Sequence, residues 1–142
     1  MTNTFKAGEH LPAIDKDIDQ ARIAGWAELS GDFNRLHVDP DYAEKTKFGG
    51  TIAHGPMSLG FLNELMMSCF GLPWAQGGRL REVRFLAPIR PGDHIVISGQ
   101  VERVEEDGKA QTLHCRLEIR KDGGETTAVT GLGVVTLGGK ES

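Results

Sequence analysis

One segment of the chain, residues 56–71 with the sequence PMSLGFLNELMMSCFG, limits the possible folds more than any other. Pro56 suits the first turn of a helix, and Gly71 followed by Pro73 suits its end. The apolar residues lie nearly all round this helix and not on one stripe; they are Met57, Leu59, Phe61, Leu62, Leu65, Met66, Met67, Cys69 and Phe70. A helix of this kind has to be buried on most of its sides. We therefore expect the rest of the chain to curl around it.

From Gly77 onward the hydrophobic period changes to two, the period of a β-strand. The segment LHCRLEIR alternates apolar and polar residues, and the apolar set is Leu113, Cys115, Leu117 and Ile119. Three more β-rich segments are RLREVRFLAPI, HIVISGQVERV and TAVTGLGVVTL, and the Asp-Gly pairs in EEDGKA and KDGGET indicate hairpin turns. We expect four strands in an antiparallel meander, with a further strand near residues 11–14.

Two shorter helices are expected before the buried one. A loose helical stripe is capped by Asp17 or Asp19 and stopped by Gly31; its apolar members are Ile18, Ile23, Trp26, Ala27 and Leu29. Asp39 can cap a second short helix, in which Pro40 suits the first turn. The segment SGDFNRLHVD, residues 30–39, is then a loop between two helices, and the glycines of KFGGTIAHGP predict another loop.

A curved antiparallel sheet around one helix is an α+β arrangement, and 142 residues suit a single domain, residues 1–142. The net charge of −4 argues against general nucleic-acid binding. The segment 57–72 is too polar and too short for membrane insertion, and the start of the chain lacks a secretory-signal layout, so we expect a cytoplasmic protein. Cys69 and Cys115 lack the spacing of a zinc or redox site and are expected to be small core residues.

The segment SGDFNRLHVDPDYAEKTKFGGTIAHGPM, residues 30–57, resembles the signature of the MaoC-like dehydratases, the (R)-specific enoyl-CoA hydratase group. The usual form of that signature is G-D-x-N-P-x-H-x-D, then A, then F-G-x-x-I-x-H-G. The segment VRFLAPIRPGDHI resembles the same family's F-x-x-P-x-x-x-G-D strand and turn. This resemblance covers residues 26–95. It implies the hot-dog fold, in which an antiparallel curved sheet wraps around one long central helix.

The resemblance also implies an activity, the reversible hydration of trans-2-enoyl thioesters of CoA or acyl-carrier protein (ACP) to (R)-3-hydroxyacyl thioesters. That reaction requires two proton-handling groups and a site for charge on the thioester oxygen. Asp32 and His37 match the family's catalytic pair and are expected to orient and deprotonate a water, with one of them returning a proton to C2. Which of the two is base and which is acid stays open. Asn34 is expected to hold the loop or the pair in position.

The backbone N–H of Gly55 is the expected donor to the thioester oxygen. Gly55 lies at the start of the buried helix, where the helix dipole favours negative charge, and Pro56 has no N–H of its own. Phe48 and Ile52 either line an acyl pocket or pack in the core. His54 either touches the substrate or, as we favour, shapes the loop.

Three further positions bear on substrate binding. Asn63 occupies roughly the place where some family members carry a small hydroxyl residue near the active site. Arg79 and Arg84 belong to a basic cluster that is either a solvated strand face or a site for the phosphates of CoA. Arg35 stands where the family usually has proline, which predicts a less rigid loop with an extra charge near the site.

Two other function classes remain open at this point. One is a hot-dog thioesterase, in which Asp32 activates water on the carbonyl; the other is a non-catalytic acyl-thioester binder or accessory subunit of a two-protein dehydratase. No metal or redox cofactor is expected, since the spacing supplies no metal-ligand set. An acyl-CoA or acyl-ACP is the expected substrate, and a homodimer or higher homo-oligomer is expected because a curled sheet leaves an open edge.

Overall fold

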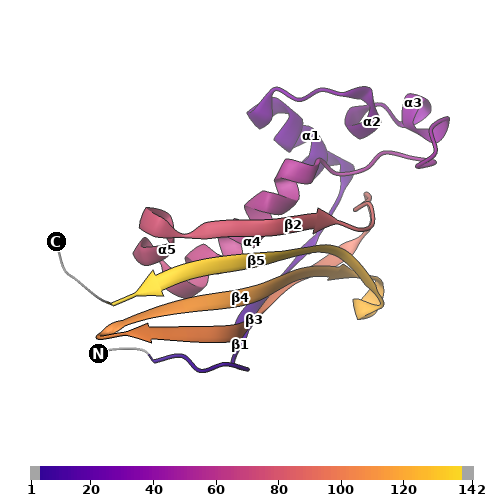
Figure 1. Ribbon diagram of the computed structural model, residues 1–142. Helices are drawn as coiled ribbons and strands as arrows, with labels where there is room; N and C mark the ends of the chain where they lie inside the picture. The colour runs from indigo at the N-terminus through magenta and orange to yellow at the C-terminus, as the bar shows by residue number, and fades with distance from the viewer. Residues whose placement is uncertain (1–3, 139–142) are drawn as a thin grey trace.

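The computed structural model describes residues 4–138 and has one five-stranded antiparallel sheet, with a long helix packed against one face and the short N-terminal helices gathered near the start of that helix (Figure 1). In chain order, the elements are β1 (His10–Asp17), α1 (Gln20–Ser30), α2 (Arg35–Val38), α3 (Pro40–Glu44), α4 (Gly55–Phe70), α5 (Leu72–Gly77), β2 (Arg79–Phe85), β3 (His94–Asp107), β4 (Ala110–Lys121), a 3-10 turn (Asp122–Gly124) and β5 (Thr126–Leu137). The expected α+β hot-dog arrangement, a curved antiparallel sheet around a central helix, is confirmed.

The strand order is β1-β3-β4-β5-β2, which corrects the expected meander at one strand. Strands β3, β4 and β5 follow one another as hairpins, as the Asp-Gly turns predicted. Strand β2 pairs with β5 at the far edge and not with β3. The connection from β2 to β3 contains Pro88 and Pro91 and no tight two-residue turn, so proximity in sequence does not force pairing. Alternation identifies a strand but not its partner.

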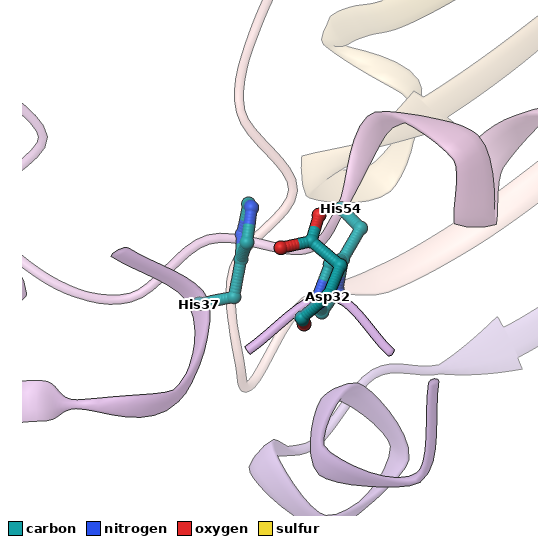
Figure 2. A group of neighbouring side chains, drawn as sticks. All are labelled: Asp32, His37 and His54. Carbon is teal, nitrogen blue, oxygen red and sulfur yellow. The ribbon is translucent and has the colours of Figure 1, made fainter. Parts of the chain in front are cut away.

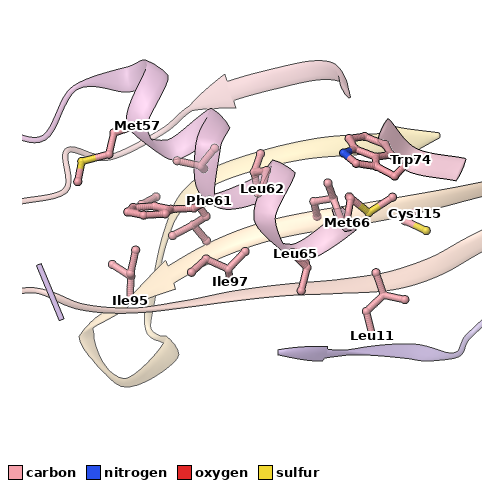
Figure 3. Packing of buried hydrophobic residues seen from close by; sticks show 14 of the residues in the cluster. Leu11, Met57, Phe61, Leu62, Leu65, Met66, Trp74, Ile95, Ile97 and Cys115 are labelled. Atoms are coloured by element: carbon pink, nitrogen blue, oxygen red, sulfur yellow. The ribbon is translucent and has the colours of Figure 1, made fainter. Parts of the chain in front are cut away.

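The core lies between α4 and the inner face of the sheet (Figure 3). The alternation in β4 is confirmed, because the side chains of Leu113, Cys115, Leu117 and Ile119 are all 0% exposed. Gly133 lets α4 approach strand β5 closely, since a Cβ there would lie 2.8 Å from Cε of Met66.

Burial raises the pKa of the Cys115 thiol to about 12 and also raises the pKa of the Cys69 thiol, so both cysteines are weak nucleophiles.

Helix α4 is less completely buried than its apolar sequence predicted. Met57 and Met66 are in the core, but Met67 is 43% exposed and lies on a flank with Asn63 and Glu64.

Among residues 4–138, no helix combines the length and the apolar character that crossing a lipid bilayer requires.

The N-terminal helices match their cap signals. Asp19 caps α1 and Gly31 ends it in the left-handed conformation, with φ at 80°. Asp39 caps α3 by accepting a hydrogen bond from the Tyr42 N–H. Leu29, expected on the buried stripe of α1, is 80% exposed, and Ile18 is buried but precedes the helix. The expected loop at 30–39 contains the short helix α2, and α5 was not expected.

Candidate active site

Two segments far apart in sequence, residues 32–38 and 51–55, lie side by side at the N-terminal end of α4. The Ile52 N–H donates to the Leu36 carbonyl at 3.3 Å, and Nδ1 of His37 bonds the Ile52 carbonyl at 2.8 Å. Gln20, the first residue of α1, joins both segments. Its amide nitrogen donates to the His37 carbonyl at 2.8 Å, and its oxygen accepts from the Thr51 hydroxyl at 2.7 Å.

The loop that carries Asp32 is folded by side-chain caps. Oδ1 of Asp32 accepts a hydrogen bond from the Asn34 N–H at 3.1 Å. Oδ1 of Asn34 in turn accepts from the Leu36 N–H at 3.0 Å and caps α2, the helix that carries His37. Such Asx caps fix the chain direction over a few residues. Asn34 therefore connects the Asp32 turn to the His37 helix, as a supporting residue would.

The hydrogen bonds of His37 define which of its ring nitrogens is available. The Ile52 carbonyl can only accept, so Nδ1 of His37 carries the hydrogen. In the neutral ring Nε2 is then left with its lone pair. An imidazole in this form can accept a proton from a nearby water.

Asp32, His37 and His54 form one cluster (Figure 2). One carboxylate oxygen or ring nitrogen from each residue lies within 4.8 Å of those of the other two. The rings of His37 and His54 stack, with centroids 3.9 Å apart and planes inclined by 26°. Asp32 is exposed, His37 is half-buried and His54 is 1% exposed. The spacing along the chain pointed to Asp32 and His37 but did not place His54 against them.

The residue types in this cluster are also those that coordinate metal ions in proteins. Imidazole nitrogens bind a metal along the ring plane, and the ligands of one ion must point at one position. The stacked rings of His37 and His54 have nearly parallel planes, so their lone pairs do not converge. This arrangement fits proton transfer better than metal coordination, and the expectation of no metal stays a prediction.

A cavity of about 370 Å³ lies beside this cluster. Its walls include His37 and four residues predicted for the oxyanion site or substrate pocket: Phe48, Ile52, His54 and Gly55. Six further wall residues are apolar and come from the end of β2, the segment after it and β5: Phe85, Leu86, Ala87, Pro88, Ile89 and Val129. An apolar cavity with a few polar groups at one end is typical of a small-molecule site.

Gly55 is the first residue of α4, with its backbone at the cavity wall. Within residues 4–138, its N–H donates to no protein acceptor. A Cβ at this position would lie 3.4 Å from Cζ of Phe85, so a larger residue would narrow the space in front of the helix. The helix N-terminus favours negative charge at this point.

Ser58 was missed by sequence reasoning, and the place of Asn63 near the active site stays a prediction. Ser58 is 3% exposed and lines the cavity, whereas Asn63 does not. Asn63 accepts a hydrogen bond from Nε1 of Trp74 at 2.8 Å and belongs to a separate surface hollow. Ser58, one turn into α4, therefore places a hydroxyl group at the cavity wall.

The three arginines singled out from the sequence lie outside the cavity wall. Arg35 is the first residue of α2, a position where proline is also favoured. Its guanidinium pairs with Asp39 at 3.2 Å and stacks over Tyr42. Arg79 and Arg84 are exposed on β2 outside the cavity, and Arg84 lines a different hollow. Their role in phosphate binding stays a prediction.

Comparisons with known proteins agree on one family. A family model described as MaoC like domain matches residues 3–121. The (R)-specific enoyl-CoA hydratase of Aeromonas caviae is 32% identical over 127 residues, covering 87% of this chain and 90% of that protein. The 3-hydroxyacyl-thioester dehydratase Z of Mycobacterium tuberculosis is 36% identical over 106 residues, covering 72% and 70%.

A solved structure resembles the whole fold. The (R)-hydratase from A. caviae involved in PHA biosynthesis superposes with a TM-score of 0.74 at 32% identity, covering 94% of this chain and 98% of that one. One matched relative, a probable dehydratase of Ajellomyces capsulatus, is much longer, and the chain spans 26% of its length.

Proposed function

The chain belongs to the MaoC-like domain family, and from this membership we propose that it reversibly hydrates trans-2-enoyl thioesters of CoA or ACP to (R)-3-hydroxyacyl thioesters. One observation supports this most directly. A carboxylate oxygen of Asp32 and a ring nitrogen of His37 lie within 4.8 Å of each other, and His37 lines an apolar cavity whose wall also includes Gly55, the first residue of α4. We assign Asp32 and His37 as the two proton-handling groups and the Gly55 N–H as the donor that the reaction requires.

In the proposed reaction, Asp32 and His37 hold one water beside C3 of the substrate. The water oxygen forms a bond to C3 while one member of the pair removes its proton. The C2–C3 π electrons move toward the thioester carbonyl, whose oxygen accepts a hydrogen bond from the Gly55 N–H and is stabilised by the dipole of α4. The pair then delivers a proton to C2, so that one water is added in total. The reverse sequence is dehydration.

The acyl chain is proposed to occupy the apolar part of the cavity. Its apolar lining residues include Phe48, Ile52, Ile89 and Val129. The thioester then lies at the polar end, near Gly55 and Ser58. No cofactor takes part in this proposal.

We also propose a homodimer. Phe85 and Leu86, at the cavity wall, are 56% and 59% exposed, and β2 forms an edge of the sheet. Exposed apolar residues beside an unpaired strand edge are typical of an interface. Light scattering on the purified protein tests this, and a monomeric mass at micromolar concentration would count against it.

The activity is tested with crotonyl-CoA and longer 2-enoyl-CoAs. Loss of the conjugated-thioester absorbance measures hydration, and chiral chromatography of the hydrolysed product measures its configuration. Free thiol is followed in parallel. Thiol release without loss of the double bond would overturn the hydratase in favour of a thioesterase, and neither signal would favour the non-catalytic binder.

A further inference from the structure

His54 is a buried histidine that the reaction as described does not use. It is 1% exposed and lies directly before α4 without capping that helix through its side chain. Its Nε2 bonds the backbone carbonyl of Asp32 at 3.0 Å, and its ring stacks on that of His37. One side chain thus contacts both members of the proposed catalytic pair.

The contacts of His54 also define which of its ring nitrogens carries a hydrogen. The Asp32 carbonyl can only accept, so Nε2 of His54 carries a hydrogen. Nδ1 of His54 is the one buried side-chain nitrogen or oxygen without a hydrogen-bond partner among the described residues. In this form Nδ1 is an acceptor that meets no donor of the described residues.

We propose that His54 is a positioning residue for the hydration reaction; this inference rests on the proposed function. The Nε2–H bond holds the Asp32 backbone, and thereby its carboxylate, beside His37. The stacked ring fixes the plane of His37, whose other restraint is the bond to the Ile52 carbonyl.

The alternative is that His54 only packs within its loop and does not position the catalytic pair. Two variants separate these two roles. His54→Gln keeps an N–H donor near the Nε2 position but removes the ring. His54→Phe keeps an aromatic ring but removes the donor to Asp32. His10→Gln, the same chemical change at an exposed residue of β1, is the matched control.

The kinetic test measures kcat and KM on the best 2-enoyl-CoA substrate, with melting temperature followed separately. We expect kcat to fall about tenfold to a hundredfold in His54→Phe, as misplaced catalytic groups do, with KM changed by less than about twofold. His54→Gln should lie between that variant and wild type, and His10→Gln should match wild type. If both His54 variants keep kcat within about twofold while only their melting temperatures fall, His54 has only a packing role and the proposal is wrong.

A second readout does not depend on activity or on the variants folding. Two-dimensional ¹H–¹⁵N spectra of the histidine rings in wild-type protein report which nitrogen carries each hydrogen. We expect His54 as the Nε2–H form and His37 as the Nδ1–H form near neutral pH. A His54 with hydrogen on Nδ1 would overturn the inference. If wild type has these forms but hydrates no 2-enoyl thioester, the proposed function fails and not the description of His54.

Discussion

The bridge made by Gln20 offers a quantitative test of how the candidate site is held together. Gln20 belongs to α1, and it reaches the His37 carbonyl with its nitrogen and the Thr51 hydroxyl with its oxygen. Thr51 is 7% exposed. Replacing Thr51 by valine keeps the shape of the side chain and removes only the hydroxyl donor. Replacing Gln20 by leucine removes both bonds at once.

The expected losses follow from the number of bonds. An intramolecular hydrogen bond contributes about 1 kcal/mol, and a partner left buried and unpaired raises the loss to about 1–3 kcal/mol. Thr51→Val should therefore lower the free energy of unfolding by about 1–2 kcal/mol, and Gln20→Leu by about 2–3 kcal/mol. The double variant should lose about 1 kcal/mol less than the sum, because the two residues share one bond.

Urea unfolding of the wild type, both single variants and the double variant measures this coupling. Thr112→Val is the matched control, since Thr112 bonds Thr136 on an exposed part of the sheet and should change stability by less than about 0.5 kcal/mol. Gln20→Leu should also lower kcat more than it raises KM, because the His37 backbone loses its donor. Additive losses in the double variant would refute the bridge as a shared interaction.

Three further outcomes are expected. Asp32→Asn and His37→Gln should each lower kcat by about 10²-fold or more with unchanged melting curves, and near-normal rates in both would refute the site assignment. The pKa of His94 is raised because the Asp17 carboxylate accepts its hydrogen bond, with the charges of Asp17 and Asp15 adding to this. Its stabilising contribution is therefore complete below the pKa of an unfolded histidine, near ~6.5, and is lost as pH rises through the raised value. Asp17→Asn should flatten that part of the stability–pH curve in thermal melts, and an unchanged curve would contradict the assignment. Arg84→Gln should raise KM for an enoyl-CoA but not for the corresponding pantetheine thioester if Arg84 binds phosphate; equal effects on both would exclude that role.

Local signals predicted the secondary structure well where the physics is local. Gly31 and Asp39 were identified as helix boundaries, and Asp19 was one of the two candidate caps of the first helix, because caps depend on hydrogen bonds within a few residues. The Asp-Gly turns predicted the β3–β4 and β4–β5 hairpins for the same reason. The missed helix α2 is four residues long, too short for a hydrophobic period to appear.

The errors concern contacts between distant segments. Ser58 was not singled out from the sequence, and Asn63, whose place near the site stays a prediction, lies five residues after it, which is about 1.4 turns away. The two side chains therefore leave α4 in different directions, and only Ser58 lines the cavity. Met67 was expected in the core because its neighbours are apolar, yet its flank of α4 stays exposed.

The sequence by itself determined the family, the buried helix, most of the strands and the motif residues Asp32, His37 and Gly55, because spacing and periodicity are properties of the chain. Only the tertiary structure decided that β2 pairs with β5, that Gln20 joins the two site segments, and that His54 stacks on His37 while bonding Asp32. These arrangements depend on how α1 and the loops pack around the start of α4. Contacts between segments so far apart in the chain do not produce a periodic pattern of apolar residues, so the sequence does not reveal them.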